Sequence, residues 1–118
     1  MPFDSVNFEK PEVVRQLEAA KALIADPTNW CQGTMAMSRH RWPIGISDPQ
    51  ASAWCSEGAI VRITGAVSEK GNLWRFLRSA SHELGYFAPF ELNDNTNHAT
   101  VMRMFDRAIE LAWEREKV

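Results

Sequence analysis

The types and order of a few polar residues could support thiol chemistry. Cys55 is followed along the chain by Asn93, Asp94 and His98. A cysteine becomes a nucleophile when a nearby imidazole takes its proton and a third group orients that imidazole. These groups can occur in any order along a chain, because geometry defines such a triad. One hypothesis is therefore a thiol-dependent hydrolase or transferase with Cys55 as nucleophile, His98 as base, and Asn93 or Asp94 as the orienting group.

A zinc site is a second chemical hypothesis. Its candidate ligands are Cys31, His40, Cys55 and either His82 or His98. Structural zinc sites usually take ligands in pairs a few residues apart, as in C-x-x-C, and the sequence contains no such pair. It also lacks a glycine-rich phosphate loop. We therefore expect no metal and no other cofactor.

The polar run at residues 93–97 has a structural explanation. Short amide and carboxylate side chains satisfy backbone N–H groups at turns and helix starts. The run lacks the glycine and the distal glutamate of a calcium loop. The run ends an aromatic connector that begins at Tyr86. We expect Asn93 and Asp94 to tie this connector to the loop at residues 30–33, where Gln32 offers both a donor and an acceptor.

Hydrophobic periodicity predicts a mainly α-helical domain with four helices around one core. The helices are expected over residues 11–25, from 47–49 to 64, over 72–84, and from 96–97 to 115. Asp48 is the expected N-cap of the second helix, which places Cys55 near its middle, where apolar neighbours would raise the thiol pKa. Gly58 in that helix predicts close approach of another backbone or a bulky ring. Gly65 and Gly85 are the expected helix stops.

Residues 28–49 separate the first two helices without a helical pattern. A segment of this length in a compact domain is expected to be a long ordered loop or a short hairpin, pinned by Trp30 and Trp42. Arg39, His40 and Arg41 form its local basic cluster, which is too small to indicate an anion site and is expected to be solvated.

Length and charge restrict the class of protein. The chain has 118 residues, 45% hydrophobic and 24% charged, with a net charge of −2. We expect one domain over residues 1–118, with residues 1–10 as an N-terminal extension. The near-neutral charge gives no case for nucleic-acid binding. No membrane span or targeting segment is visible, so the expected location is cytoplasmic, with Cys31 and Cys55 as free thiols.

Four segments together resemble a family of small domains of unknown function from bacteria and their phages. They are Asn-Trp-Cys-Gln-Gly (29–33), Ala-Trp-Cys-Ser-Glu-Gly-Ala (53–59), Leu-Asn-Asp (92–94) and the run 101–109. The resemblance covers about residues 12 to 113 and implies no established activity. It marks as family positions Trp30, Gln32, Gly33, Cys55, Gly58, Ala59, Asn93 and Asp94.

A binding or accessory module is the function class that the sequence favours over an enzyme. Such a module needs no triad, cofactor loop or basic stripe, and exposed tryptophans and arginines dominate protein-binding surfaces. The expected partner is another protein, and a homo-oligomer is compatible with the sequence. The candidate binding residues are Trp30, Gln32, Gly33, Arg39, Arg41, Trp42 and Asn93. The exposure of Cys55 and its contact with His98 would separate this class from the thiol enzyme.

Overall fold

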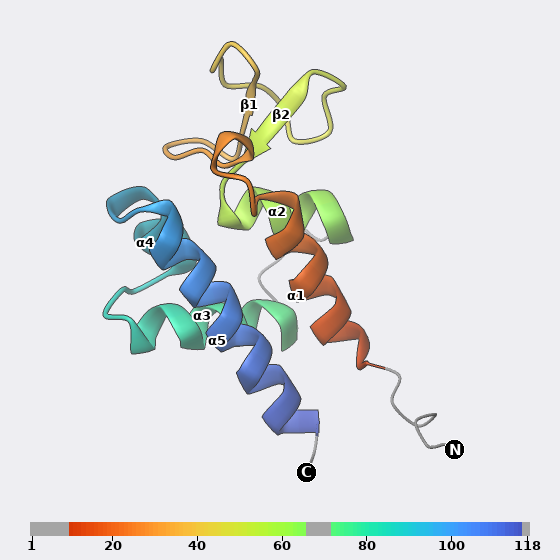
Figure 1. Ribbon diagram of the computed structural model, residues 1–118, viewed down its shortest axis with the longest axis vertical. Helices are drawn as coiled ribbons and strands as arrows, with labels where there is room; N and C mark the ends of the chain where they lie inside the picture. The colour runs from red at the N-terminus through yellow and green to blue at the C-terminus, as the bar shows by residue number, and fades with distance from the viewer. Residues whose placement is uncertain (1–9, 66–71, 117–118) are drawn as a thin grey trace.

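The computed structural model describes residues 10–65 and 72–116, which form five α-helices and a two-stranded sheet (Figure 1). The elements in chain order are α1 (Glu12–Leu23), a 3-10 turn η1 (Pro27–Asn29), β1 (Ala36–Ser38), β2 (Ala51–Trp54), α2 (Ser56–Thr64), α3 (Asn72–Glu83), α4 (Pro89–Asn95) and α5 (His98–Glu116). The prediction of a mainly helical chain is confirmed. Of the predicted N-terminal extension, residues 1–9 lie outside the described part.

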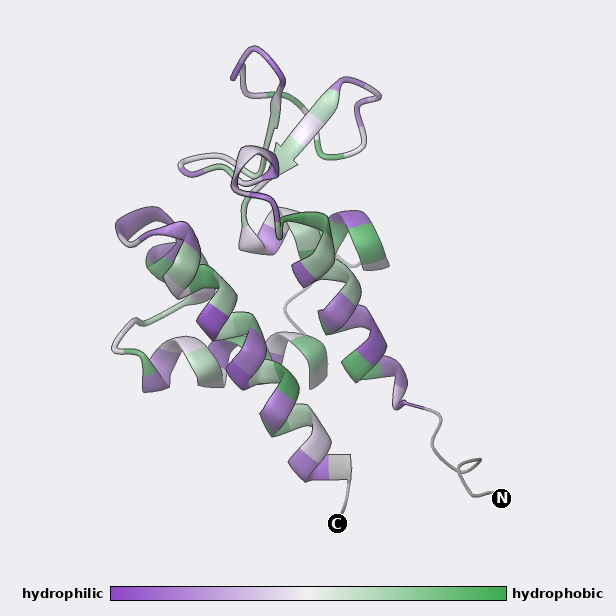
Figure 2. Ribbon diagram, in the orientation of Figure 1, coloured by the Kyte–Doolittle hydropathy of each residue, from purple (hydrophilic) through white to green (hydrophobic). Residues whose placement is uncertain are grey.

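The helices form one body in which α5 packs against α1 and α3, and α1 also packs against α2. Hydrophilic and hydrophobic bands alternate along α1 and α5, as expected for helices with one buried side (Figure 2). The core between them contains fully buried Leu17, Ile60, Leu77 and Phe105. Within the described residues, no helix has the length and hydrophobicity that crossing a bilayer requires.

Residues 27–54 form a small lobe, here called the β lobe, at one end of the helical body (Figure 1). Its two strands are antiparallel, with Ala36 opposite Trp54, and the register shifts between Met37 and Ser38. The first of these short strands, β1, lies in the segment for which the sequence predicts a long ordered loop or a short hairpin. The second strand, β2, instead lies in a segment for which the sequence predicts helix.

The predicted start of the second helix at residues 47–49 is wrong. Asp48 caps a turn instead, because its carboxylate accepts the Gln50 N–H at 2.8 Å. Residues 51–54 are held as a strand by partners far along the chain: the Trp54 carbonyl accepts the Cys31 N–H at 3.1 Å, and the Cys55 N–H donates to the Met35 carbonyl at 3.2 Å. Cys55 is consequently the N-cap of α2 and does not lie in mid-helix.

The predicted number of four helices is also wrong, because part of the expected connector forms α4. Pro89 occupies the first turn of this short helix, where a missing N–H costs nothing. The last helix begins as predicted, with the Asn97 side chain accepting the Thr100 N–H at 2.9 Å. The expected stops at Gly65 and Gly85 both follow the ends of their helices.

The tryptophans divide into core and surface. Trp54 and Trp74 are buried, and Trp30 and Trp113 are partly buried against the core. The prediction that Trp42 pins the loop is wrong, since 69% of its surface is exposed. A strand–turn backbone holds this position in place without burial of the ring.

Gly58 marks the closest approach between the β lobe and the helical body. A Cβ at this position would collide with the backbone carbonyl of Met35, so the predicted approach of another backbone is confirmed. The same stretch of backbone accepts the Cys55 N–H. The absence of a side chain at Gly58 is thus what lets the lobe lie on the start of α2.

Replacing Gly58 by alanine tests this close approach. In an unhindered helix the change would stabilise the protein by about 1 kcal/mol. Here we expect a loss of about 2 kcal/mol or more in the free energy of unfolding, because backbone must move to admit the methyl group. Urea denaturation measures it, with Gly45→Ala, which has open space around it, as the control. A neutral or stabilising Gly58→Ala would contradict the packing.

Candidate functional site

The polar residues that the sequence singles out meet where the β lobe, the start of α2 and the C-terminal half of α4 come together. We call this place the Asn93 joint and define it by Trp30, Cys31, Gln32, Gly33, Ser56, Asn93 and Asp94. Three of the four bonds of the Asn93 side chain reach segments more than thirty residues away in sequence. The predicted tie between the connector and the loop at residues 30–33 is confirmed.

The side-chain amide of Asn93 is fully buried and uses its whole bonding capacity. Its Oδ1 accepts from the indole N–H of Trp30 at 2.7 Å and from the backbone N–H of Ser56 at 2.9 Å. Its Nδ2 donates to the Cys31 carbonyl at 3.1 Å and to Asp94 Oδ1 at 3.0 Å. No donor or acceptor of this amide is left for a substrate.

The rim of the joint is polar and reaches the surface. Gln32 Nε2 donates to the carbonyls of Asn93 at 3.0 Å and Thr96 at 3.1 Å. The Asp94 carboxylate accepts the backbone N–H of Gly33 at 2.9 Å, where the chain has a φ of 82° that glycine adopts readily. The candidate binding residues Trp30, Gln32 and Asn93 therefore bond within the chain here.

Cys55 acts as a helix cap in this structure. Its thiol sulfur accepts the Gly58 N–H at 3.2 Å, and only 5% of the residue is exposed. Burial raises the pKa of the thiol from 9.0 to about 12, an effect that the Gly58 N–H only partly opposes. A neutral thiol that caps a helix is a poor nucleophile at neutral pH.

His98 lies in the first turn of α5, and its ring has partners other than Cys55. Its Nε2 is 2.8 Å from the Ile24 carbonyl, and its ring packs edge-on against Trp30 with centroids 5.6 Å apart. Asp94, the proposed orienting group, bonds to Gly33 and Asn93. Cys55, His98 and Asp94 thus each have other partners, and catalysis by this set stays a prediction.

The second thiol is also buried. The Cys31 sulfur donates to the Thr34 carbonyl at 3.5 Å, and burial raises its pKa to about 11. Both cysteines are free, as expected. Within residues 10–65 and 72–116, no group of three His, Cys, Asp or Glu side chains could hold a metal ion.

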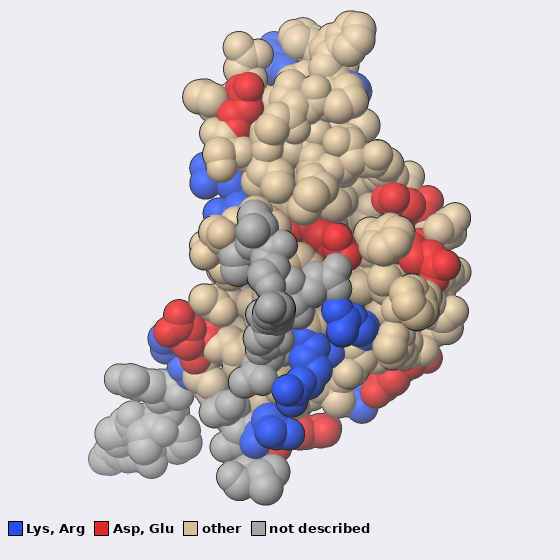
Figure 3. Space-filling model, turned by 180° about the vertical axis from the view of Figure 1, so that it is seen from behind, with Lys and Arg blue, Asp and Glu red and all other residues tan. Residues whose placement is uncertain are grey.

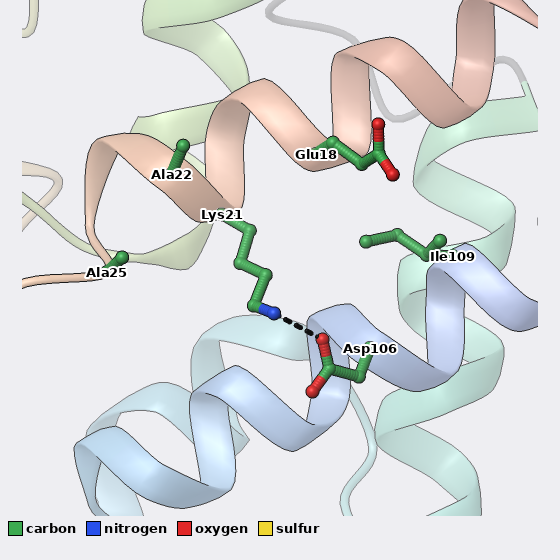
Figure 4. Close-up of a pocket in the computed structure, with 6 residues that line it drawn as sticks. All are labelled: Glu18, Lys21, Ala22, Ala25, Asp106 and Ile109. Atoms are coloured by element: carbon green, nitrogen blue, oxygen red, sulfur yellow. Dashed lines mark ion pairs between the residues drawn. The ribbon is translucent and has the colours of Figure 1, made fainter. Parts of the chain in front are cut away.

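A groove of about 460 Å³ lies between α1 and α5 (Figure 4). The residues that line it are Glu18, Lys21, Ala22, Ala25, Asp106 and Ile109. Lys21 and Asp106 form an ion pair of 2.5 Å across it, and Glu18 pairs with Lys10 at 2.9 Å. Its charges are mutually compensated, so the groove offers a ligand little electrostatic attraction.

The tip of the β lobe presents the other candidate binding residues. Arg39, Arg41 and Trp42 are all exposed. Arg41 has a φ of 67° and donates from its guanidinium to the Trp30 carbonyl at 3.1 Å. Beside them lies a hollow of about 360 Å³, lined by residues 38–40 and 49–52. The structure therefore separates the predicted binding residues into a closed joint and an open tip.

One exposed surface was not predicted from the sequence. Phe87 and Phe90 are 79% and 51% exposed at the corner between α3 and α4. They line a hollow of about 350 Å³ together with Arg78, His82 and Ala88. The signal in the sequence was the aromatic connector, which has three aromatic residues among residues 86–90. Local sequence does not show whether these rings are buried or exposed.

Comparison with known proteins gives a family and no activity. A family model described as "Family of unknown function (DUF6197)" matches residues 9–111. No curated protein and no solved structure matches the chain.

Replacing Asn93 by alanine tests the joint. The change would leave Trp30, Ser56 and Cys31 with unpaired backbone or indole groups, each costing about 1–3 kcal/mol where water cannot reach. We expect a loss of about 3 kcal/mol or more in the free energy of unfolding, measured by urea denaturation. Asn95→Ala is the matched control, because its exposed amide makes one bond, to the Glu91 carbonyl, and should cost less than about 1 kcal/mol. Equal losses for the two variants would contradict the role of Asn93.

Thiol labelling tests the state of Cys55. With its pKa raised from 9.0 to about 12, the folded protein at pH 8 should react with iodoacetamide about a hundredfold or more slowly than the protein in urea. The unfolded thiol ionises first, so the free energy of unfolding should fall as pH rises from about 9 to 12. Rapid labelling of Cys55 in the folded state, located by mass spectrometry, would instead support the thiol enzyme.

Proposed function

The chain belongs to the family of unknown function DUF6197, and from this premise we propose that it is a protein-binding module whose contact surface is the tip of the β lobe. The observation that carries the proposal is the exposure of Trp42, 69% of whose surface faces solvent. A tryptophan left in water forgoes one of the largest hydrophobic gains that a side chain can make. Tryptophan is also strongly enriched among the residues that dominate protein interfaces.

The backbone around Trp42 supports this proposal, because hydrogen bonds within the chain already hold it in one conformation. The Ser38 N–H donates to the Trp42 carbonyl at 2.9 Å, and the Trp42 N–H donates to the Ser38 hydroxyl at 3.3 Å. Arg41 closes the turn through its N–H to the Ser38 carbonyl at 2.9 Å and joins it to the lobe through Trp30. A backbone held in this way loses little conformational entropy on binding.

The surroundings of Trp42 indicate what the partner offers. Arg39, three residues before Trp42, is exposed and forms no ion pair within the described residues. The Asp48 carboxylate, on the same connection between β1 and β2, accepts the Gln50 N–H. The partner would supply an apolar pocket for the indole ring and carboxylates for Arg39. Charge pairs of this kind at the rim of an interface raise the association rate.

The test first identifies the partner by cross-linking from position 42 and then measures its affinity. A photoreactive phenylalanine analogue at position 42 would cross-link the partner in the host, and the purified partner would be titrated against the wild type and Trp42→Ala. We expect Trp42→Ala to weaken binding about thirtyfold or more, equivalent to about 2 kcal/mol. Ile63→Ala, which shortens an exposed apolar side chain on α2, is the control and should bind as the wild type does. Equal affinity of the wild type and Trp42→Ala would refute the proposed surface.

A further inference from the structure

The corner between α3 and α4 presents two aromatic rings that the fold leaves outside its core. Phe87 and Phe90 are the exposed pair, and they line a hollow of about 350 Å³ together with residues of α3. Exposed single apolar residues are common on proteins, but two large rings at one hollow form a contiguous apolar patch. Such a patch can bury an apolar side chain of a partner.

The backbone at this corner is held firmly. The Phe87 N–H donates to the Glu91 carboxylate at 2.6 Å, and the Phe87 carbonyl lies 2.8 Å from His82 Nε2. The Phe87 ring packs at a tilt near His82, with centroids 6.4 Å apart. The Tyr86 N–H returns to the Ser81 carbonyl at 2.9 Å. Phe87 is therefore presented by a fixed turn, and Phe90 lies in the first turn of α4.

A basic stripe on α3 runs beside this patch. Arg75, Arg78 and His82 follow one another at three- and four-residue spacing, so they lie on one side of the helix. Arg75 is exposed and forms no ion pair within the described residues. Figure 3 shows the side of the molecule hidden in Figure 1, where basic side chains gather along a diagonal.

The carboxylates nearest this corner in the chain are already engaged. Glu83 receives two bonds from the Arg107 guanidinium, at 2.7 and 3.3 Å, and Glu91 accepts the Phe87 N–H. Arg75 itself is exposed and unpaired within the described residues, so its charge is accessible to a ligand. Arg75 does not line the hollow but lies on the same side of α3, seven residues or about 10 Å along the helix from His82, which does. An extended segment with an apolar side chain in the hollow and a carboxylate farther along α3 would complement both features.

We propose that the α3–α4 corner binds an acidic segment of another protein, with an apolar side chain of that segment seated between Phe87 and Phe90 and a carboxylate on Arg75. This surface is distinct from the tip of the β lobe and gives the module a second contact. Single-stranded nucleic acid has a related chemistry, since bases stack on aromatic rings and phosphates pair with arginine. The short stripe and the net charge of −2 favour the protein segment over a polyanion.

A library of displayed random twelve-residue peptides tests the proposal directly, with the peptides themselves as probes. Peptides would be selected on the wild-type protein and counter-selected on the double variant Arg75→Glu/Phe87→Ser, whose altered side chains are both exposed. We expect the selected peptides to combine Asp or Glu with a large apolar residue. In fluorescence anisotropy, synthetic copies should bind the double variant at least thirtyfold more weakly than the wild type.

Matched variants separate this surface from the rest of the molecule. Arg103→Glu makes the same charge change at an exposed position of α5, and Trp42→Ser removes an exposed ring at the lobe tip. Both should bind the selected peptides within about twofold of the wild type, whatever the outcome at Trp42 with its own partner. Circular dichroism and urea denaturation would show that each variant remains folded.

Each of the following outcomes would overturn the proposal. They are a selection that yields no peptide discriminating the wild type from the double variant, selected peptides without acidic residues, and tighter binding of a labelled ten-nucleotide oligothymidylate than of the selected peptides. Replacing Asp and Glu by Lys in a selected peptide should abolish its binding, and retention of binding would count equally against it.

Discussion

The side-chain amide of Asn93 is the interaction on which the arrangement of the molecule depends. It is buried, and its four hydrogen bonds reach the loop that begins the β lobe, the first residue of α2 and the neighbouring Asp94. A buried amide with all partners in place is stabilising, whereas the same amide with one partner missing would be costly. The Asn93 side chain, which belongs to α4, therefore holds both the β lobe and the start of α2 against that helix.

The steric fit at Gly58 complements this polar joint. Met35 of the β lobe contacts the start of α2 through backbone atoms, and Cys55 both donates its N–H to Met35 and caps the helix with its sulfur. These contacts account for the burial of the thiol and for its raised pKa. Cys55, the candidate nucleophile in the sequence, thus caps a helix, and the packing that holds the β lobe also buries its thiol.

The side-chain amide at the centre of the Asn93 joint is therefore fully bonded within the chain, whereas the exposed aromatic rings lie at the tip of the β lobe and at the α3–α4 corner. Trp42 at the lobe tip and Phe87 at the α3–α4 corner are held by turns that do not bury their rings. A polar group whose hydrogen bonds are all made within the chain must break one of them to bind a ligand. A partner can bury an exposed ring on a fixed turn at a small cost in backbone entropy. Recognition, in our proposal, therefore resides in surface aromatics flanked by arginines.

Local periodicity was sufficient for the helices that became α1, α3 and α5, because a 3.6-residue repeat of apolar side chains is visible within a short window. The glycine at position 58 and the pair Asn93-Asp94 also indicated their contacts correctly, since few residue types fit a close backbone approach or a bonded turn. The strand at residues 51–54 was not predictable in this way, because Cys31 and Met35, far along the chain, supply its partners. Nor was the exposure of Trp42, Phe87 and Phe90, since an aromatic residue in a connector looks the same in sequence whether it is buried or exposed.

The sequence alone thus determined a helical chain and the tie between Asn93-Asp94 and the loop at residues 30–33. Only the tertiary structure decided which side chains are bonded within the Asn93 joint and which stay exposed on the surface, because burial depends on contacts between segments distant in sequence.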